Sequence, residues 1–103
     1  LPDSEKAILE VTRMIREDFL QQSAYSDTDA FCPIEKQYLM LAVIMTYYEH
    51  VILAMNRGIS LRQVQALPLR ALIGRMKEAG DAGAVRQMID EVSTTISRLE
   101  VER

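Results

Sequence analysis

Apolar residues recur every three or four positions along most of this 103-residue chain, and this spacing limits the possible folds more than any other feature. It places the residues on one side of an α-helix, whereas a half-buried strand needs strict alternation. The first helix is predicted to begin at Asp3 or Ser4, whose side chains can accept a hydrogen bond from the first turn. Its apolar stripe comprises Ile8, Val11, Met14, Ile15 and Phe19, and its opposite side comprises Glu10, Arg13, Arg16 and Glu17.

The most apolar part of the chain is predicted to form a central helix from Pro33 to about Arg57. Proline suits a first helical position because its missing N–H would be unpaired there, and Gly58 suits the position after the last turn. The segment is apolar nearly all round, which is typical of a helix surrounded by others. Its most apolar run, residues 38–48, is shorter than a membrane span, so we expect no direct membrane insertion.

A short helix is predicted soon after the central one. Ser60 and Gln63 have the spacing of a capping box, in which each side chain bonds to the backbone N–H of the other residue. Ile59 and Val64 are placed to form the accompanying hydrophobic staple. Pro68 then ends this helix and opens another, because proline is tolerated in the first turn and not in the interior.

The chain is predicted to finish with one more long helix. The helix that Pro68 opens continues to about Ala79, and Gly80 and Asp81 then interrupt the chain and cap the next helix. The last helix carries its apolar residues at Val85, Met88, Ile89, Val92, Ile96 and Leu99. We therefore predict a single all-α domain over residues 1–103, a small bundle of about five helices of which two are long, two are short and one is long and C-terminal.

Side chains that could carry chemistry are few. One cysteine and one histidine cannot make the usual zinc site, and on one helical segment Cys32 and His50 would be about 27 Å apart. His50 is instead predicted to lie near the negative end of its helix. The adjacent carboxylates Glu17-Asp18 and Asp90-Glu91 are predicted to be solvated, because neighbours point different ways around a helix. The glycines lack phosphate-loop spacing, so we expect no catalytic residue and no metal site.

Residues 60–77 could be read as the paired helices of a DNA-binding motif. Arg70, Arg75 and Lys77 would then contact phosphates. The net charge of −3 and the proline at the turn argue against this, and we expect no nucleic-acid partner.

The segment between the first two helices contains turn-forming residues together with two of the six aromatic residues, Tyr25 and Phe31. An aromatic ring can stack on a purine base for about 1–3 kcal/mol. Buried aromatic rings are also common in helical bundles, and from the residues alone we favour that second interpretation.

Four blocks of sequence resemble one protein family. Residues 13–22 (RMIREDFLQQ), 29–32 (DAFC), 35–38 (EKQY) and 66–70 (ALPLR) are similar to the catalytic A subunit of V-type and archaeal-type rotary ATPases. The resemblance covers roughly residues 1–78, and the last helix is similar only in pattern. The chain departs from the family at Ser23-Ala24-Tyr25, where members have Asn-Ala-Phe, and at Phe31, where Tyr is frequent.

The resemblance implies a C-terminal helical domain of a protein that makes or hydrolyses ATP and couples this to transport of protons or sodium ions. The chain has no initiator Met and no phosphate loop, so we expect a fragment that is inactive alone and lacks a preceding helix. It would hold no cofactor itself, while the parent protein would bind ATP or ADP and Mg²⁺. Its implied partners are the B subunits and the central stalk, in a complex on the cytoplasmic side of a membrane.

The resemblance also assigns two sites. Tyr25 and Phe31 would line the adenine pocket, Tyr25 with the stronger case. The opening segment would contact the rotor, with Asp3 and Glu5 facing a basic stalk; it consists of Leu1, Pro2, Asp3, Ser4, Glu5 and Lys6. From the residues alone, the same segment is an ordinary helix start with surface acids.

A different class of protein accounts for the same helices. A free-standing helical interaction module would also show caps, amphipathic stripes and no chemistry, although it would not explain the four similar blocks. If helices that normally precede this chain are missing, apolar surface should be uncovered, and the chain should self-associate through it.

Overall fold

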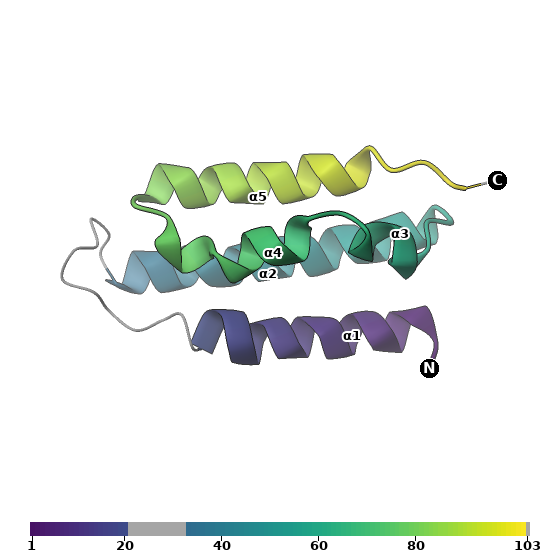
Figure 1. The fold of residues 1–103 in the computed structure, drawn as a ribbon, viewed down its shortest axis with the longest axis horizontal. Coiled ribbons are helices and arrows are strands. Elements are labelled where there is room, and N and C mark those ends of the chain that lie inside the picture. Colours follow the sequence, from purple (N-terminus) through teal and green to yellow (C-terminus); the bar gives the residue numbers. More distant parts are fainter. Residues whose placement is uncertain (21–32, 103) are drawn as a thin grey trace.

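The computed structural model describes residues 1–20 and 33–102, and within these ranges all regular structure is helical. The helices lie side by side in an elongated body of 49 × 25 × 17 Å (Figure 1). The elements are α1 (Asp3–Met14), a π-helical turn (Ile15–Leu20), α2 (Pro33–Asn56), α3 (Leu61–Gln65), α4 (Leu69–Gly74), a 3₁₀ turn (Met76–Glu78) and α5 (Ala82–Ser97). The predicted all-α bundle is confirmed.

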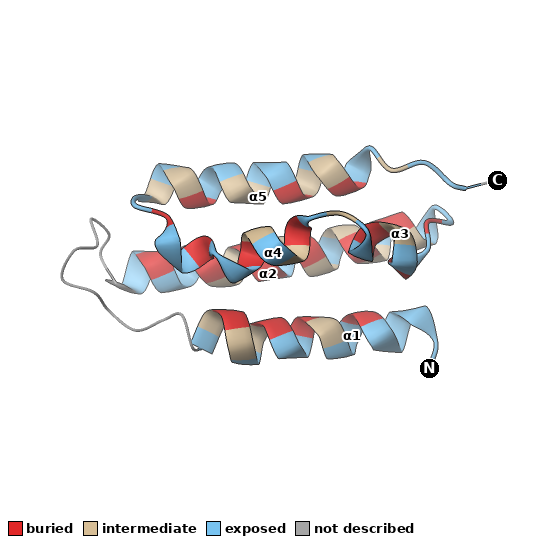
Figure 2. Cartoon of the chain, viewed as in Figure 1, coloured by how far each residue is buried: buried red, intermediate tan, exposed pale blue. Residues whose placement is uncertain are grey.

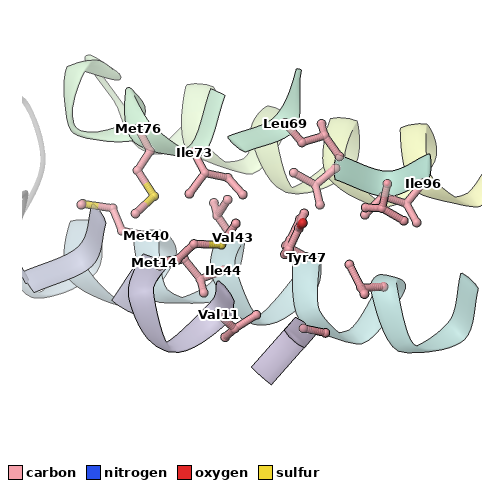
Figure 3. Packing of buried hydrophobic residues seen from close by; sticks show 14 of the residues in the cluster. Val11, Met14, Met40, Val43, Ile44, Tyr47, Leu69, Ile73, Met76 and Ile96 are labelled. Atoms are coloured by element: carbon pink, nitrogen blue, oxygen red, sulfur yellow. The ribbon is translucent and has the colours of Figure 1, made fainter. Parts of the chain in front are cut away.

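Helix α2 is the centre of this arrangement. It contacts both α1 and α5, which lie on either side of it, and α3 and α4 cross in front of it (Figure 1). The buried side chains of α1, α4 and α5 line the sides that face α2 (Figures 2 and 3). The core comprises Ala7, Val11, Met14, Leu39, Met40, Val43, Ile44, Tyr47, Val51, Ala54, Ile59, Leu61, Val64, Leu69, Ile73, Met76, Ala79, Val85, Val92 and Ile96.

The prediction that α2 is apolar because neighbours surround it is wrong for one side of the helix. Its buried residues occupy one face, whereas Ile34, Tyr38, Met45 and Leu53 are exposed. Residues Ile34–Asn56 are also long and apolar enough to cross a bilayer by length and composition. A core helix passes the same test, and the packing of α2 against α1 and α5 is that of a core helix.

The ends of α2 and the starts of α3 and α5 follow the sequence signals closely. Gly58 has a positive φ of 94°, and the backbone N–H of Ile59 donates to the carbonyl of Ala54 at 3.0 Å, which closes the last turn of α2. The capping box is present: Gln63 N donates to Ser60 Oγ at 3.2 Å, and Ser60 N donates to Gln63 Oε1 at 3.1 Å. The side chain of Asp81 caps α5 as predicted.

Helix α1 departs from its prediction in three respects. Its N-cap is Pro2, which provides no side-chain hydrogen bond to the first turn, rather than Asp3 or Ser4. Ile8, predicted to belong to the buried stripe, is 50% exposed, because the buried side runs through Ala7, Val11 and Met14. The helix also widens into a π-helical turn from Ile15 onwards, which apolar periodicity does not reveal. The helix after Pro68 likewise ends at Gly74, earlier than predicted, and continues as the 3₁₀ turn.

Replacing Met14 by Ala should lower the free energy of unfolding by about 2–5 kcal/mol, because the side chain is fully buried and its loss leaves a cavity. The matched change Ile8→Ala on the same helix should cost less than about 1 kcal/mol, because half of that side chain is already in water. Urea unfolding of the two variants measures both values. Equal losses would mean that α1 packs with the side predicted from the sequence.

Candidate functional site

Of the two predicted sites, the structure describes only the opening segment, at the start of α1. Leu1 to Lys6 are all exposed, with Leu1 at 74%. The carbonyl of Pro2 accepts hydrogen bonds from the backbone N–H groups of Glu5, at 3.1 Å, and Lys6, at 3.0 Å, so this end is a closed helical turn. Tyr25 and Phe31, with Cys32, lie outside the described residues, and their placement near a ligand stays a prediction.

One predicted rotor-contact acid has a structural partner. Asp3 Oδ2 accepts a hydrogen bond from the backbone N–H of Leu61 at 3.2 Å. Leu61 is the first residue of α3, where the N–H groups have no partner within the helix and the helix dipole favours a negative charge. Asp3 therefore fastens the start of α1 to the start of α3, and of the two acids named for the rotor contact only Glu5 is without this constraint.

A second acid contacts the same pair of helices near the middle of α1. Glu10, predicted to face solvent, accepts a hydrogen bond from the Tyr47 hydroxyl through one carboxylate oxygen. Its other oxygen accepts from Gln65 Nε2 on α3 at 3.2 Å. Burial, together with the hydrogen bond to Glu10, raises the pKa of Tyr47 well above its usual value, so the hydroxyl stays protonated and donates.

The third contact lies in the π-helical turn. Asp18 is buried and pairs directly with Arg70 of α4, and Glu17 Oε2 lies 3.6 Å from the other terminal nitrogen of Arg70. The prediction that Glu17 and Asp18 are solvated and diverge is wrong, since both reach one guanidinium. Burial raises the pKa of Asp18, the positive charge of Arg70 opposes this shift, and the nearby Glu17 charge adds to it. Arg70, engaged with both acids, is also not the phosphate contact that a DNA-binding motif would need.

The acids that contact α3 and α4 are spaced seven residues apart. Asp3 contacts Leu61, Glu10 contacts Gln65, and Glu17 contacts Arg70. Seven residues are close to two helical turns, so these acids share one side of the helix. We call them, with Asp18, the acid row. The seven-residue spacing of these acids is visible in the sequence, but the prediction that acids on this side of the helix are solvated did not indicate their contacts.

The start of α2, where the segment containing Tyr25 and Phe31 ends, is also fastened. Glu35 Oε1 lies 3.3 Å from Arg86 Nη2 of α5. The buried Lys36 donates from Nζ to the carbonyl of Lys77 at 2.9 Å. The described residues on either side of residues 21–32 are therefore bonded to other helices, through Asp18 before that range and through Glu35 and Lys36 after it.

His50 links two helices and does not mark a helix end as predicted. Its Nδ1 lies 2.9 Å from the carbonyl of Thr46, and its Nε2 lies 3.0 Å from Ser93 Oγ on α5. Arg57, two turns beyond, donates to the carbonyls of Ile96 and Leu99 and so satisfies the C-terminal end of α5. These groups have structural partners, and among the described residues no group of three or more His, Cys, Asp or Glu side chains could hold a metal ion.

The described part of the chain thus belongs to the class of helical bundle domains whose polar side chains fasten helices to one another. Residues 1–65 match the family model for the C-terminal domain of V and A type ATP synthases. The chain belongs to this family.

Similar proteins extend the match over nearly the whole chain. It is 51% identical over 102 residues to the second A subunit of the A-type ATP synthase of Methanospirillum hungatei, covering 99% of this chain and 18% of that protein. It is 48% identical over 99 residues to the A subunit of the A-type ATP synthase of Thermococcus kodakarensis, covering 96% of this chain and 17% of that protein. The similarity therefore reaches beyond residue 78 into α5, which the sequence blocks did not indicate, and the chain spans less than a fifth of these relatives.

Replacing Arg70 by Met should lower the free energy of unfolding at pH 7 by about 1–3 kcal/mol, because Asp18 loses its charged hydrogen-bond partner. The lower part of the range is expected, since the Arg70 side chain is 36% exposed. Because the native-state pKa of Asp18 is raised, its protonated form stabilises the fold at low pH, and this contribution is lost as the pH rises through the native-state pKa. Without Arg70 that pKa rises further, so the loss should shrink at pH 4.

Urea unfolding at pH 4 and pH 7 measures the effect, with Arg86→Met as the matched control. Arg86 forms an exposed ion pair with Glu35, and its replacement should change the free energy of unfolding by less than about 0.5 kcal/mol at either pH. Equal losses for the two variants would show that the Asp18–Arg70 pair contributes no more to the free energy of unfolding than an exposed ion pair does.

Proposed function

We propose that this chain acts as the C-terminal lever of the A subunit of an A-type ATP synthase, in which ATP synthesis or hydrolysis is coupled to transport of protons or sodium ions. The observation that carries the proposal is the 51% identity over 102 residues to a protein of that name. The geometry supports it: a helical domain offers no phosphate cradle, but it can connect two sites mechanically.

The lever is α1 with its π-helical turn. One end is the exposed segment Leu1 to Lys6, proposed to contact the rotor, and the other leads towards Tyr25 and Phe31, proposed to line the adenine pocket. The 18 residues from Asp3 to Leu20 span about 27 Å. The acid row fastens this element to α3 and α4 near the start, middle and end. A displacement at one end would therefore be transmitted to the other rather than absorbed between helices.

The remaining parts of the proposal concern the longer polypeptide. ATP or ADP and Mg²⁺ would be bound mainly by the portion that precedes this domain. The B subunits and the central stalk would be its partners, and the complex would be attached to a membrane at its cytoplasmic side. The observed core packing of α2 fits a peripheral domain without an inserted helix.

A free-standing interaction module is the alternative function. The uncovered apolar side of α2 favours it, because such surfaces often bind partners. Translation of the coding sequence upstream of Leu1 separates the two. The motif G-x-x-x-x-G-K-[ST] on a strand-to-helix turn supports the ATP synthase, and a start codon directly before Leu1 supports the module.

In the longer polypeptide, Tyr25→Ala should weaken nucleotide binding about tenfold, because stacking on the adenine is lost. Tyr25→Phe retains a ring and should bind almost normally. Calorimetry with ATP measures both affinities, and the 103-residue chain alone should show no detectable binding because the phosphates have no cradle. An unchanged affinity of Tyr25→Ala would instead place this residue in the bundle core.

Glu5→Gln in the assembled complex should reduce the torque on the rotor if charge contributes to the contact, because Glu5 is exposed at the proposed rotor end. Asp3→Asn is a less direct test, since it also weakens the bond to Leu61 and should destabilise the domain by about 1 kcal/mol. Single-molecule rotation measures the torque, and thermal unfolding of the isolated variants measures stability. Unchanged torque with Glu5→Gln would show that shape rather than charge transmits force.

A further inference from the structure

The π-helical turn Ile15–Leu20 interrupts the buried row of α1. That row consists of Ala7, Val11 and Met14, whose spacing is four and then three residues. On an uninterrupted α-helix the next position of the row would be four residues further on, at Asp18. An α-helical end of α1 would therefore turn the Asp18 side chain into the apolar core, an environment that favours the neutral acid over the carboxylate.

The same turn also interrupts the row of acids that contact α3 and α4. Asp3 and Glu10 are seven residues apart, and on an α-helix the next member would be Glu17. In the structure Asp18 makes the direct bond to Arg70 instead, while Glu17 Oε2 lies 3.6 Å from the guanidinium. The hydrogen bonds of a π-turn span five residues rather than four, so the turn takes up one residue more. Asp18 therefore occupies the place that Glu17 would have.

Two arrangements of this helix end thus bring one carboxylate to Arg70. In the observed arrangement, which we call the π register, Asp18 is bonded to Arg70 and Phe19 packs partly buried against the core. In the other, which we call the α register, Glu17 would be bonded to Arg70 and Asp18 would lie in the core. Phe19 would then turn by roughly 100° about the helix axis, towards solvent. Because an ion pair to α4 is present in both registers, exchange between them does not require that α1 separate from α4.

The charge on Asp18 distinguishes the two registers. The ionised carboxylate needs the guanidinium, since a bare charge among apolar side chains is strongly disfavoured, whereas the neutral acid enters the core at a smaller cost. Burial raises the pKa of Asp18, the Arg70 charge opposes this shift, and the Glu17 charge adds to it. Asp18 therefore takes up a proton at a higher pH than an ordinary aspartate does.

The other charged groups around the turn have partners of their own. Within the turn, Arg16 lies 3.7 Å from Glu17. On α2, which packs against the turn, Tyr47 stays protonated and donates to Glu10. The charged side chains in the first two turns of α2 are bonded to other elements; they are Glu35 and Lys36. Arg70 is therefore the cation for which the two acids of the π-helical turn compete.

We propose that the end of α1 is a proton-operated switch between the two registers. With Asp18 ionised, the end is a π-turn. When Asp18 takes up a proton from water, the turn closes to an α-helix, Glu17 replaces Asp18 on Arg70, and Phe19 leaves the core. The switch turns the end of the helix without releasing it from α4. It uses only groups within this domain, so it does not depend on the proposed lever function.

The test follows the ring at position 19 by fluorine NMR. Phe19 is replaced by 4-fluorophenylalanine in the longer polypeptide, and a soluble paramagnetic agent reports whether the ring is covered. The otherwise unchanged protein at pH 7 should show mainly a protected signal. Asp18→Asn mimics the protonated acid at constant pH and should increase an unprotected signal at least about fivefold. Asp90→Asn, at an exposed position on α5, is the matched control and should leave the spectrum unchanged.

A single protected signal in Asp18→Asn would show that the π-turn is fixed and would overturn the proposal. Local unfolding of the helix end would also uncover the ring, and the double variant Glu17→Gln/Asp18→Asn separates this case. The switch needs the Glu17 charge to bind Arg70, so in the double variant the unprotected signal should be at least about threefold weaker than in Asp18→Asn. An equal or stronger signal in the double variant would mean that the end has unfolded, which also overturns the switch.

Discussion

Helices α1, α3 and α5 all contact α2, and its buried side forms the middle of the core. Burial of apolar surface is the main stabilising term for such a bundle, and α2 supplies seven of the core residues, from Leu39 to Ala54. Burial alone is not directional, however, and would allow α1 to slide or rotate against α2. The position of α1 is set by the acid row, because hydrogen bonds and ion pairs require particular partners at particular distances.

The acid row also explains how a domain without catalytic groups can contribute to a machine. Asp3, Glu10 and Asp18 each bond to a different residue of α3 or α4, so α1 and these two helices form one body. The π-helical turn at the far end of α1 places Asp18 and Glu17 so that both reach Arg70. A body of this kind suits the transmission of a displacement better than the making of a bond, which agrees with the role that we propose within the longer polypeptide.

Most helix boundaries followed from local signals, while the burial of individual residues did not. The capping box at Ser60, the stop at Gly58 and the cap at Asp81 involve residues within five positions of each other, so their geometry is determined nearby. The exposure of Ile8 and the burial of Asp18 depend on which side of α1 meets its neighbours. The candidate site divides in the same way: Leu1 to Lys6 are exposed as a surface contact requires, but the partner of Asp3 lies 58 residues away. The adenine-pocket assignment of Tyr25 and Phe31 comes from family resemblance and lies outside the described residues.

The sequence by itself determined the all-α class, the order of the helices and the family, because apolar periodicity, caps and matched residues are properties of short segments. Only the tertiary structure decided that the acids of α1 bind α3 and α4 and that the apolar residues of α2 divide into a core side and an open stripe. Periodicity shows which residues share a side of a helix, but it does not show which side a neighbour covers. That choice follows from long-range contacts such as Asp18 with Arg70 and Glu10 with Tyr47, which join residues far apart in the chain.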